Sequence, residues 1–467
     1  MRILFDSRQT QYKTPFGTLR TGECCVLQIR IPTEVGASGV RLMLEDSEHA
    51  VCAELPFSFA SRGEDGYELW RLEFTRQETG LHFYWFRIDK RDGGSFRLFR
   101  QGRDTNMEAG EKWQLSVIPA DFRVPDFAPG AVMYQIFPDR FARSGSSDLT
   151  GKLQPFWVHE SPDELPEYRP DAHGEVRNND FFGGNFAGIR EKLPYLQELG
   201  VGVLYLNPIF MAWSNHRYDT ADYRRPDPML GTEEDFCALC DAAHARGMRV
   251  ILDGVFSHTG SNSVYFDAKH VFGHGAASDP NSPYRRWYRF HHYPDDYEAW
   301  WGIRTLPCVE ELDETYLHYI IEDEDSVIAH WLRLGADGFR LDVVDELPDE
   351  FVRRLRRRMR QIDPQSLLLG EVWEDASNKR AYGVSRRYFV DGELDSVMNY
   401  PWRNAIVAFL TDADDGTALG ESLMTLAENY PPEVLSCVMN HLGTHDTPRI
   451  LTVLGEPFRG TKDERAH

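Results

Sequence analysis

The sequence has few cysteines and no long apolar segment. Its seven cysteines are an odd number in a chain of 467 residues, which does not fit the paired framework of a small disulfide-stabilised secreted domain. No run approaches the roughly 18 apolar residues that a membrane-spanning helix needs. Residues 1–8 also lack the apolar stretch of a secretory signal. The sequence therefore predicts a cytoplasmic protein with no membrane partner.

Two of the cysteines, Cys237 and Cys240, form a C-x-x-C pair. Such a pair can carry redox or metal chemistry, but no second pair follows at the spacing of a zinc site. The flanking residues 233–246 have the composition of a helix. We therefore interpret the pair as helix residues that pack against a core, with redox or metal binding as the alternative.

Basic residues are outnumbered, with 51 lysines and arginines against 74 aspartates and glutamates and a formal net charge of −23. A field of this sign repels phosphate backbones, which argues against a nucleic-acid partner. A basic run at residues 353–360 lies on a helical pattern with one apolar face, so we interpret it as an outer helix rather than a nucleic-acid patch. Aromatic residues reach 13%. Their flat faces suit neutral sugars as well as the filling of a core.

The chain divides into regions of different pattern. Residues 1–120 contain short runs rich in β-branched and aromatic residues, separated by turn signals, which predicts an N-terminal antiparallel β-sandwich. The runs are residues 24–32, 40–45, 67–74, 81–88, 96–100 and 113–118. Residues 121–129, which include Pro125 and Pro129, are predicted to be a linker.

From residue 130 onward, strand and helix patterns alternate. Strands are predicted at residues 132–137, 201–206, 248–252, 338–341, 367–369, 397–399 and 435–439. Helices are predicted at residues 186–199, 233–246, 325–334 and 348–361. This alternation indicates an α/β fold with a parallel sheet, and its length favours a (β/α)8 TIM barrel over residues 130–467, truncated after its seventh strand. Residues 259–318, after the third strand, are too long for a plain loop and are predicted to form an inserted subdomain.

Carboxylates follow four of the predicted strands. In a β/α barrel the functional residues stand at the C-terminal ends of the strands. Asp253, Asp342, Glu371 and Asp446 occupy such positions, in the segments DGVFSH (253–258), GFRLDVVDE (338–346), GEVW (370–373) and HLGTHD (441–446). Any one of them is more often a turn or salt-bridge residue. Four at one barrel mouth indicate a shared site.

Glycosidic cleavage is the chemistry that needs such a set. One carboxylate must face the anomeric carbon, and a second, protonated carboxyl must reach the leaving oxygen. Arg340 lies one pleat from Asp342 on the same strand face, which predicts that it holds Asp342 ionised. Neighbouring carboxylates and burial are expected to raise the pKa of Glu371, as a general acid requires.

The four segments, in this order, resemble the four signature regions of the α-amylase family, glycoside hydrolase family 13. Three more resemble its neopullulanase, cyclomaltodextrinase and maltogenic amylase branch: YQIFPDRF (134–141), FGGNFAGI (182–189) and HRYDTADY (216–223). The resemblance covers about residues 120–455, and residues 1–120 match the starch-binding-like module of that branch. It implies an enzyme that cleaves α-1,4 links, with α-1,6 links left open, in maltodextrins, cyclodextrins, pullulan or starch.

The resemblance also implies roles for single residues. Asp342 would be the nucleophile, Glu371 the general acid and then base, and Asp446 the third carboxylate, which binds sugar hydroxyls. Arg340 would position Asp342, and Asp253 would bond to that arginine. The residues expected to bind the sugar at the cleavage point are Tyr134, His216, His258 and His445. A retaining mechanism requires the Asp342 and Glu371 carboxyls to lie about 5–5.5 Å apart.

The sequence departs from the family pattern at two places. Before His258 the family usually has an asparagine that ligates calcium, whereas this chain has Ser257. No metal or other cofactor is therefore predicted to be required, and calcium binding is left open. Relatives continue to an eighth barrel strand and a C-terminal β-domain, and this chain stops at His467. The branch also implies a homodimer, which nothing in the sequence itself shows.

Two alternatives to an active hydrolase stay open at this point. One is a non-catalytic α-glucan-binding protein, against which the intact set of carboxylates argues. The other is an inactive truncated fragment of such an enzyme, with an open barrel edge. Linkage preference, substrate form and the balance of hydrolysis against transglycosylation are not decided by the sequence.

Overall fold

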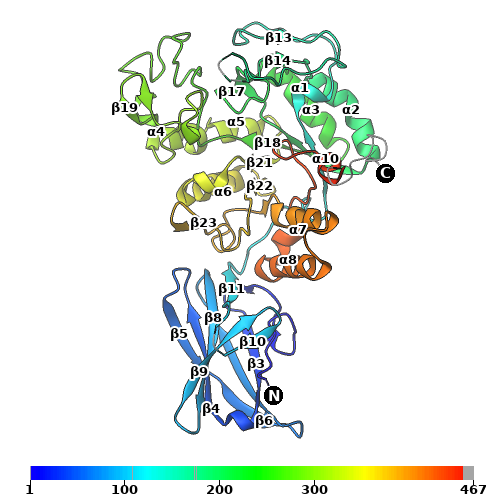
Figure 1. Ribbon diagram of the computed structural model, residues 1–467. Coiled ribbons are helices and arrows are strands. Elements are labelled where there is room, and N and C mark those ends of the chain that lie inside the picture. Colours follow the sequence, from blue (N-terminus) through cyan, green and yellow to red (C-terminus); the bar gives the residue numbers. More distant parts are fainter. Residues whose placement is uncertain (1, 108, 173, 175, 456–467) are drawn as a thin grey trace.

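A computed structural model describes residues 2–107, 109–172, 174 and 176–455 (Figure 1). The N-terminal β-region, blue in Figure 1, lies at one end, and the α/β region stacks above it. Each region has a hydrophobic core of its own, one built around Leu27, Phe86 and Trp113 and the other around Phe256 and Trp331. Among the described residues, no helix is long and apolar enough to cross a membrane.

The N-terminal region consists of two antiparallel-dominated sheets. One has the order β1 (Lys13–Thr14), β3 (Cys24–Pro32), β7 (Tyr67–Thr75) and β6 (Ser58–Arg62). The other contains β10 (Asp104–Asn106), β9 (Ser95–Gln101), β8 (Gly80–Lys90), β11 (Trp113–Ile118) and β2 (Leu19–Arg20), with β4 (Ala37–Glu45) on β8 and β5 (Val51–Pro56) on β4. Alternate residues of β7, including Trp70, Leu72 and Phe74, point into the core, as a strand with one buried face requires.

The six strands predicted from the sequence correspond to β3, β4, β7, β8, β9 and β11. The prediction missed the shorter or more exposed strands β1, β2, β5, β6 and β10. All five residues of β6 are exposed, so this edge strand shows no alternation of apolar and polar residues. Residues 121–129, the predicted linker, are turns and coil.

The α/β region is built on a six-stranded parallel sheet in sequence order. Its strands are β12 (Val132–Ile136), β15 (Val201–Leu206), β18 (Arg249–Gly254), β21 (Gly338–Leu341), β22 (Leu367–Gly370) and β25 (Ser396–Val397). Buried apolar faces of four helices pack against this sheet: α2 (Phe186–Glu198), α3 (Glu233–His244), α5 (Val327–Arg333) and α6 (Asp349–Ile362). The chain runs from strand to helix and back, which is the path of a β/α barrel.

The remaining elements of this region are short or follow the sheet. Between β12 and α3 lie α1 (Pro138–Phe141), β13 (Trp157–Val158), β14 (Asp180–Phe181), β16 (Phe210–Ala212) and β17 (Thr220–Pro226). The hairpin of β23 (Arg380–Ala381) and β24 (Val384–Ser385) precedes β25. After β25 come α7 (Tyr400–Leu410), α8 (Gly416–Asn429), α9 (Pro432–Cys437) and α10 (Ile450–Gly455).

The predicted seventh strand is wrong for most of its length. Residues 435–437 belong to helix α9, and within 435–439 only Met439 pairs with a strand neighbour, Met398. Pro431 and Pro432 preset the backbone for a helix start, and a short apolar run does not distinguish strand from helix by itself. The described residues thus form a six-stranded part of a barrel sheet, with one further bridge at Met439.

A long segment separates β18 from α5. It holds β19 (Phe290–His292), β20 (Asp296–Tyr297), α4 (Glu314–Leu317), and the short helical turns Arg285–Trp287, Trp300–Gly302 and His318–Glu322. Tyr265, Phe266 and Trp287 are buried and form aromatic contacts that hold it together. The sequence prediction of an inserted segment at residues 259–318 falls here.

The other two sequence features have helical settings. Cys237 and Cys240 lie on α3, and both thiols are free. The basic run belongs to α6, where Phe351, Leu355 and Met359 are buried and most arginines face outward. Arg356 is the exception, because it is buried and bonded to Asp395. The amphipathic helix therefore accounts for the basic run.

Candidate active site

The strand register gathers the predicted carboxylates at one end of the sheet. Asp253 on β18 pairs directly with Arg340 on β21. Asp342 and Glu371 each follow the last residue of a strand by one position. The Asp342 amide donates to Gly254 O at 3.1 Å, and the Glu371 amide donates to Leu341 O at 3.1 Å. The parallel ladder thus continues past the strand ends and places three carboxylates side by side.

Arg340 joins these carboxylates. Its side chain is fully buried, and its Nη1 donates to Asp253 Oδ1 and to Asp342 Oδ1, both at 2.7 Å. Its Nη2 lies 2.9 Å from Glu371 Oε2, a charge contact without hydrogen-bond geometry. One guanidinium therefore contacts three carboxylates. The site holds more negative charge than its one arginine neutralises.

The two candidate catalytic carboxyls have opposite pKa shifts. Burial raises the pKa of Asp342 well above its usual range, and repulsion from Glu371 adds to this against the attraction of Arg340. Burial also acts to raise the pKa of Glu371, but Arg340, the Val343 amide at 2.8 Å and Trp373 Nε1 at 3.0 Å outweigh it and lower the value. Both directions are opposite to the sequence predictions, which expected Arg340 to hold Asp342 ionised and burial to raise the pKa of Glu371. The two groups are close enough to titrate as a pair.

A network of uncharged groups flanks the carboxylates. Asp253 Oδ2 accepts bonds from Tyr205 OH at 2.6 Å and Tyr218 OH at 2.8 Å. Tyr218 OH also lies 2.6 Å from His445 Nε2, with the two rings stacked at 5.5 Å. Gln135 Nε2 lies 2.7 Å from His445 Nδ1. This network links the ends of β12, β15 and β18 to the segment that carries Asp446.

Sequence reasoning gives no role to several members of this network. In the sequence Tyr205 reads only as an apolar strand residue, and the hydroxyl it directs at Asp253 has no signature there. Asn207, whose Nδ2 donates to Tyr218 OH at 2.9 Å, follows β15 directly. The rule that finds Asp342 and Glu371 at strand ends would have found Asn207 too.

The other predicted sugar-binding residues surround this core. His258 is buried, and its Nε2 has no hydrogen-bond partner among the described residues. Burial lowers the pKa of His258 to about 4, so the ring is neutral near pH 7. His216 accepts the Tyr218 amide at Nδ1. Asp446 is the outermost carboxylate, with its side chain 34% exposed and 3.3 Å from His445 Nε2.

A cavity of about 640 Å³ opens beside the network. Tyr134 lines it with its ring edge-on to Phe141, together with Gln135, Asn207 and His445. A volume of this size fits one or more sugar rings and falls within the usual range of small-ligand sites. The predicted residues Tyr134 and His445 thus share a cavity next to the carboxylates.

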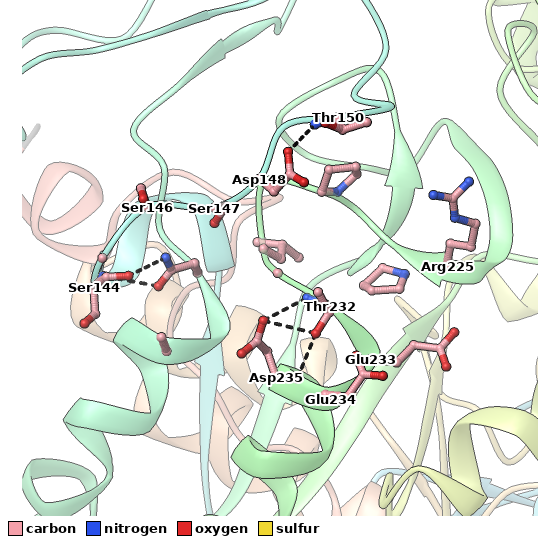
Figure 2. Close-up of a pocket in the computed structure, with 17 residues that line it drawn as sticks. Ser144, Ser146, Ser147, Asp148, Thr150, Arg225, Thr232, Glu233, Glu234 and Asp235 are labelled. Carbon is pink, nitrogen blue, oxygen red and sulfur yellow. Dashed lines mark hydrogen bonds between the residues drawn. The ribbon is translucent and has the colours of Figure 1, made fainter.

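A second cavity, of about 430 Å³, shares none of these lining residues (Figure 2). Several of its polar side chains form hydrogen bonds that cap helix N-termini or close turns. Thr232 and Asp235 form the capping box of α3, Asp148 accepts the Thr150 amide, and Asn185 caps α2. These groups are already bonded to the backbone, so the cavity is explained by local structure.

Ser257 does not fit the calcium ligand that the family resemblance implies. Its side chain is buried and offers a hydroxyl where an amide oxygen would be needed. Ser257 Oγ lies 3.0 Å from His258 Nδ1, which engages that hydroxyl within the site. The residues at this position therefore do not match a calcium site of that kind.

Comparison with known proteins decides the family. The family model of the α-amylase catalytic domain matches residues 135–466, well over half of the chain. The chain belongs to the α-amylase family. The matched region contains all six strands of the parallel sheet apart from the first residues of β12.

Relatives in this family are longer than this chain. An amylopullulanase of Thermoanaerobacter thermohydrosulfuricus is 34% identical over 96% of this chain and 33% of its own length. A cyclomaltodextrinase of Geobacillus thermopakistaniensis is 34% identical over 73% of this chain and 54% of its own length. The chain spans about a third to a half of these relatives.

Solved structures of other proteins resemble this fold. A cyclomaltodextrinase structure superposes with a TM-score of 0.63 and 26% identity, and covers 97% of this chain and 73% of that one. The Ttha1563 protein of Thermus thermophilus reaches a TM-score of 0.58 and 37% identity, over 73% of this chain and 69% of that one. The match to the cyclomaltodextrinase extends over the N-terminal β-region as well as the sheet.

Proposed function

We propose that this chain hydrolyses α-glucosidic bonds in maltodextrins, cyclodextrins, pullulan or starch, with retention of anomeric configuration. The observation that carries the proposal is the contact of Asp253, Asp342 and Glu371 with the single buried guanidinium of Arg340. Two carboxyls on adjacent strand ends are what glycosidic cleavage needs. The kinship with amylopullulanases and cyclomaltodextrinases supports the choice of an α-glucan.

In the first step, the Asp342 carboxylate attacks the anomeric carbon while the bond to the leaving oxygen breaks. Glu371 gives its proton to that oxygen, so the leaving chain departs as a neutral alcohol. In the second step, the Glu371 carboxylate takes a proton from water as the water oxygen attacks the same carbon and releases Asp342. Two inversions at one carbon give net retention.

The pKa directions add a requirement to this mechanism. The first step needs the shared proton on Glu371, whereas the contact between Arg340 and Glu371 lowers the pKa of that group and burial raises the pKa of Asp342. A leaving group that separates Glu371 from Arg340 works against both effects, because the guanidinium then attracts Asp342 and Asp253 but no longer Glu371. Substrate entry thus moves the proton to the group that must donate it.

The remaining residues would hold the sugar and the charge. Asp446 and His445 would accept and donate bonds to hydroxyls at the cleavage point, and His258 would use its free Nε2. Tyr134 would lie beneath the sugar ring. His216, which accepts the Tyr218 amide, would hold the turn that carries Tyr218. Asp253 and its two tyrosines fix the direction of the Arg340 fork.

Product analysis on pullulan tests the proposal. We expect release of reducing sugar from pullulan and from cyclodextrin, with panose, isopanose or maltotriose identifying the pullulan bond that is cut. Binding of these glucans without any new reducing ends would instead favour a non-catalytic α-glucan-binding protein. Absence of both binding and cleavage would contradict the proposal altogether.

Three further proposals accompany the activity. We propose that the reaction needs no metal. Ser257 in place of a calcium ligand supports this proposal, and unchanged rates in the presence of a chelator test it.

A homodimer is supported by the resemblance to the neopullulanase branch alone and is tested by sedimentation. A cytoplasmic location is supported by 32% identity over 71% of this chain to an intracellular maltogenic amylase of Bacillus subtilis. Cell fractionation tests it.

A further inference from the structure

A third cavity, of about 290 Å³, lies between the inserted segment and the β23–β24 hairpin. Its lining includes Ser257, Trp301, Glu346 and Tyr382. Ser257 connects it to the candidate active site through the bond to His258. The cavity thus lies beside the candidate site, near the segments that follow β18 and β21.

Trp301 lines this cavity. The side chain is 80% exposed, although it is a large aromatic group. Its ring stacks on that of Trp300 at 5.4 Å and 25°. Trp301 also has a φ of 50°, in the left-handed region that bulky residues seldom adopt. Strain of this kind, at an exposed aromatic residue, points to a binding role rather than a packing role.

Tyr382 faces the same cavity from the hairpin. It is 74% exposed and has a φ of 51°, followed by Gly383 at 80°, so the two residues form the tight turn between β23 and β24. A single oxygen, Glu346 Oε1, accepts Trp301 Nε1 at 3.0 Å and Tyr382 OH at 3.1 Å. Glu346 is four residues after Asp342, so both rings are held in place from the turn that carries the proposed nucleophile.

The N-terminal β-region supports this hairpin from outside. Glu48, in the turn between β4 and β5, accepts bonds from Arg380 Nη1 at 3.0 and 3.1 Å and from Ser385 Oγ at 3.1 Å. Arg380 and Ser385 are the paired residues at the base of the hairpin, directly below Tyr382. A residue of one region therefore fixes the position of an aromatic ring in the other.

We propose that Trp301 and Tyr382 bind glucosyl units of the leaving-group side of an α-glucan, and that Glu48 positions Tyr382 for this contact. The inference rests on the proposed function. Flat ring faces match the apolar faces of a pyranose, and the nearby Glu346 carboxylate accepts hydroxyl donors. The acidic lining, which includes Glu310, disfavours phosphorylated or acidic sugars and so selects a neutral chain.

The side of the cleavage point follows from the order of the strands. The larger cavity, with Tyr134 and His445, belongs to β12, β15 and the segment after Met439. The Trp301 cavity belongs to the other side, next to the strand end that carries Glu371, the proposed donor to the leaving oxygen. The sugar beyond that oxygen therefore reaches Trp301 and Tyr382.

Kinetics on two substrates test this site. Maltoheptaose extends beyond the cleavage point, whereas α-maltosyl fluoride has only fluoride as its leaving group. We expect Trp301→Ala and Tyr382→Ala each to lower kcat/KM for maltoheptaose about tenfold, the loss of one ring contact, and to change it less than about twofold for the fluoride. Tyr195→Ala, at a 49% exposed tyrosine on helix α2, is the matched control and should leave both unchanged.

The role of Glu48 needs a double variant. Glu48→Ala alone should lower kcat/KM for maltoheptaose a few-fold, and should have no further effect when Tyr382→Ala is already present. Additive losses would show that Glu48 acts only through general stability and would overturn its positioning role.

Two results would overturn the binding site itself: unchanged rates on maltoheptaose in both aromatic variants, or equal losses on the two substrates. If the native chain cleaves neither substrate, the proposed function fails. Maltoheptaose titrated calorimetrically into native and Trp301→Ala protein then decides the site separately, because the proposal predicts about tenfold weaker binding by the variant.

Discussion

Two buried arginines of the parallel sheet region have opposite surroundings. Arg340, at the C-terminal ends of the strands, contacts three carboxylates, those of Asp253, Asp342 and Glu371. Arg356, on helix α6, shares one carboxylate, that of Asp395, with Arg360. The first cluster has an excess of negative charge, and the second has an excess of positive charge.

The pKa values follow this difference. Burial acts to lower the pKa of Arg340, but Asp253 and Glu371 raise it well above the usual value. Burial lowers the pKa of Arg356 to about 10, because the single carboxylate of Asp395 does not offset it and Arg360 repels it. Asp395 is fully bonded, since its Oδ2 accepts the Leu368 amide at 2.8 Å.

The two clusters have different roles, one in the stability of the fold and the other in the proposed reaction. The Arg356 cluster joins helix α6 to residues beside β22 and β25, where all partners are satisfied and the pair supports the fold. The Arg340 cluster keeps carboxylates close to one another at a cost in repulsion, and burial raises the pKa of one of them, Asp342, well above its usual range. Uncompensated charge at strand ends marks the reactive end of the sheet.

The largest expected effect is on activity at the Arg340 cluster. Asp342→Asn and Glu371→Gln should each lower the hydrolysis rate by about 10²–10⁴-fold, because each removes a group that forms or breaks bonds with substrate. The melting temperature should not fall, since both variants relieve repulsion between carboxylates. Reducing-sugar assays and calorimetric melting measure the two effects. Full activity in both variants would contradict the catalytic roles of Asp342 and Glu371.

The next effect is on stability at the Arg356 cluster. Asp395→Asn leaves the buried Arg356 without its counter-ion and should lower the free energy of unfolding by about 3–5 kcal/mol. The folded protein should keep its kcat/KM. Urea titration followed by circular dichroism measures the loss, and Asp121→Asn, at an exposed aspartate, serves as the control. A selective loss of activity would contradict the separation of the two clusters.

The pH dependence of stability sharpens the comparison further. The pKa of Asp342 is higher in the folded state than in the unfolded state. The stability that its protonated form contributes is therefore fully present below about pH 4, and it is lost as the pH rises through the folded pKa. Relative to Asp342→Asn, the native protein should therefore lose stability between pH 4 and pH 7. Melting curves of both proteins across this range test it. A difference that is constant with pH would argue against a raised pKa.

The smallest effect is expected at the rim of the structural cluster. Arg360 is 34% exposed, and its loss leaves Asp395 bonded to Arg356 and to the Leu368 amide. Arg360→Ala should therefore cost at most ~1 kcal/mol of stability. The same urea titration measures it. A cost as large as that of Asp395→Asn would show that the second arginine is part of the essential pair.

The sequence predicts the reactive end of the sheet better than its details. Asp253, Arg340, Asp342 and Glu371 follow from one rule, that functional groups stand at the C-terminal strand ends. Strands with buried apolar runs, such as β15 and β18, follow from composition. The prediction of a strand at residues 435–439 is wrong where it meets helix α9, because these mostly apolar residues fit either structure until neighbouring packing decides.

The remaining features depend on side-chain contacts that no sequence pattern carries. The pKa of Glu371 is lowered because Arg340 Nη2, the Val343 amide and Trp373 all reach it, and this depends on side-chain directions. Tyr205 looks like any buried strand residue until its hydroxyl meets Asp253. The exposed strand β6 lacks alternation because it lies at a sheet edge.

The central claim is that Asp342 forms a covalent bond to the sugar. The most direct test treats the protein with a 5-fluoro-α-maltosyl fluoride, which forms the glycosyl enzyme quickly and releases it slowly, followed by digestion and mass spectrometry. The mechanism predicts one added glycosyl group, on the peptide that contains Asp342. A label on another residue, or turnover with inverted configuration and no label, would contradict it.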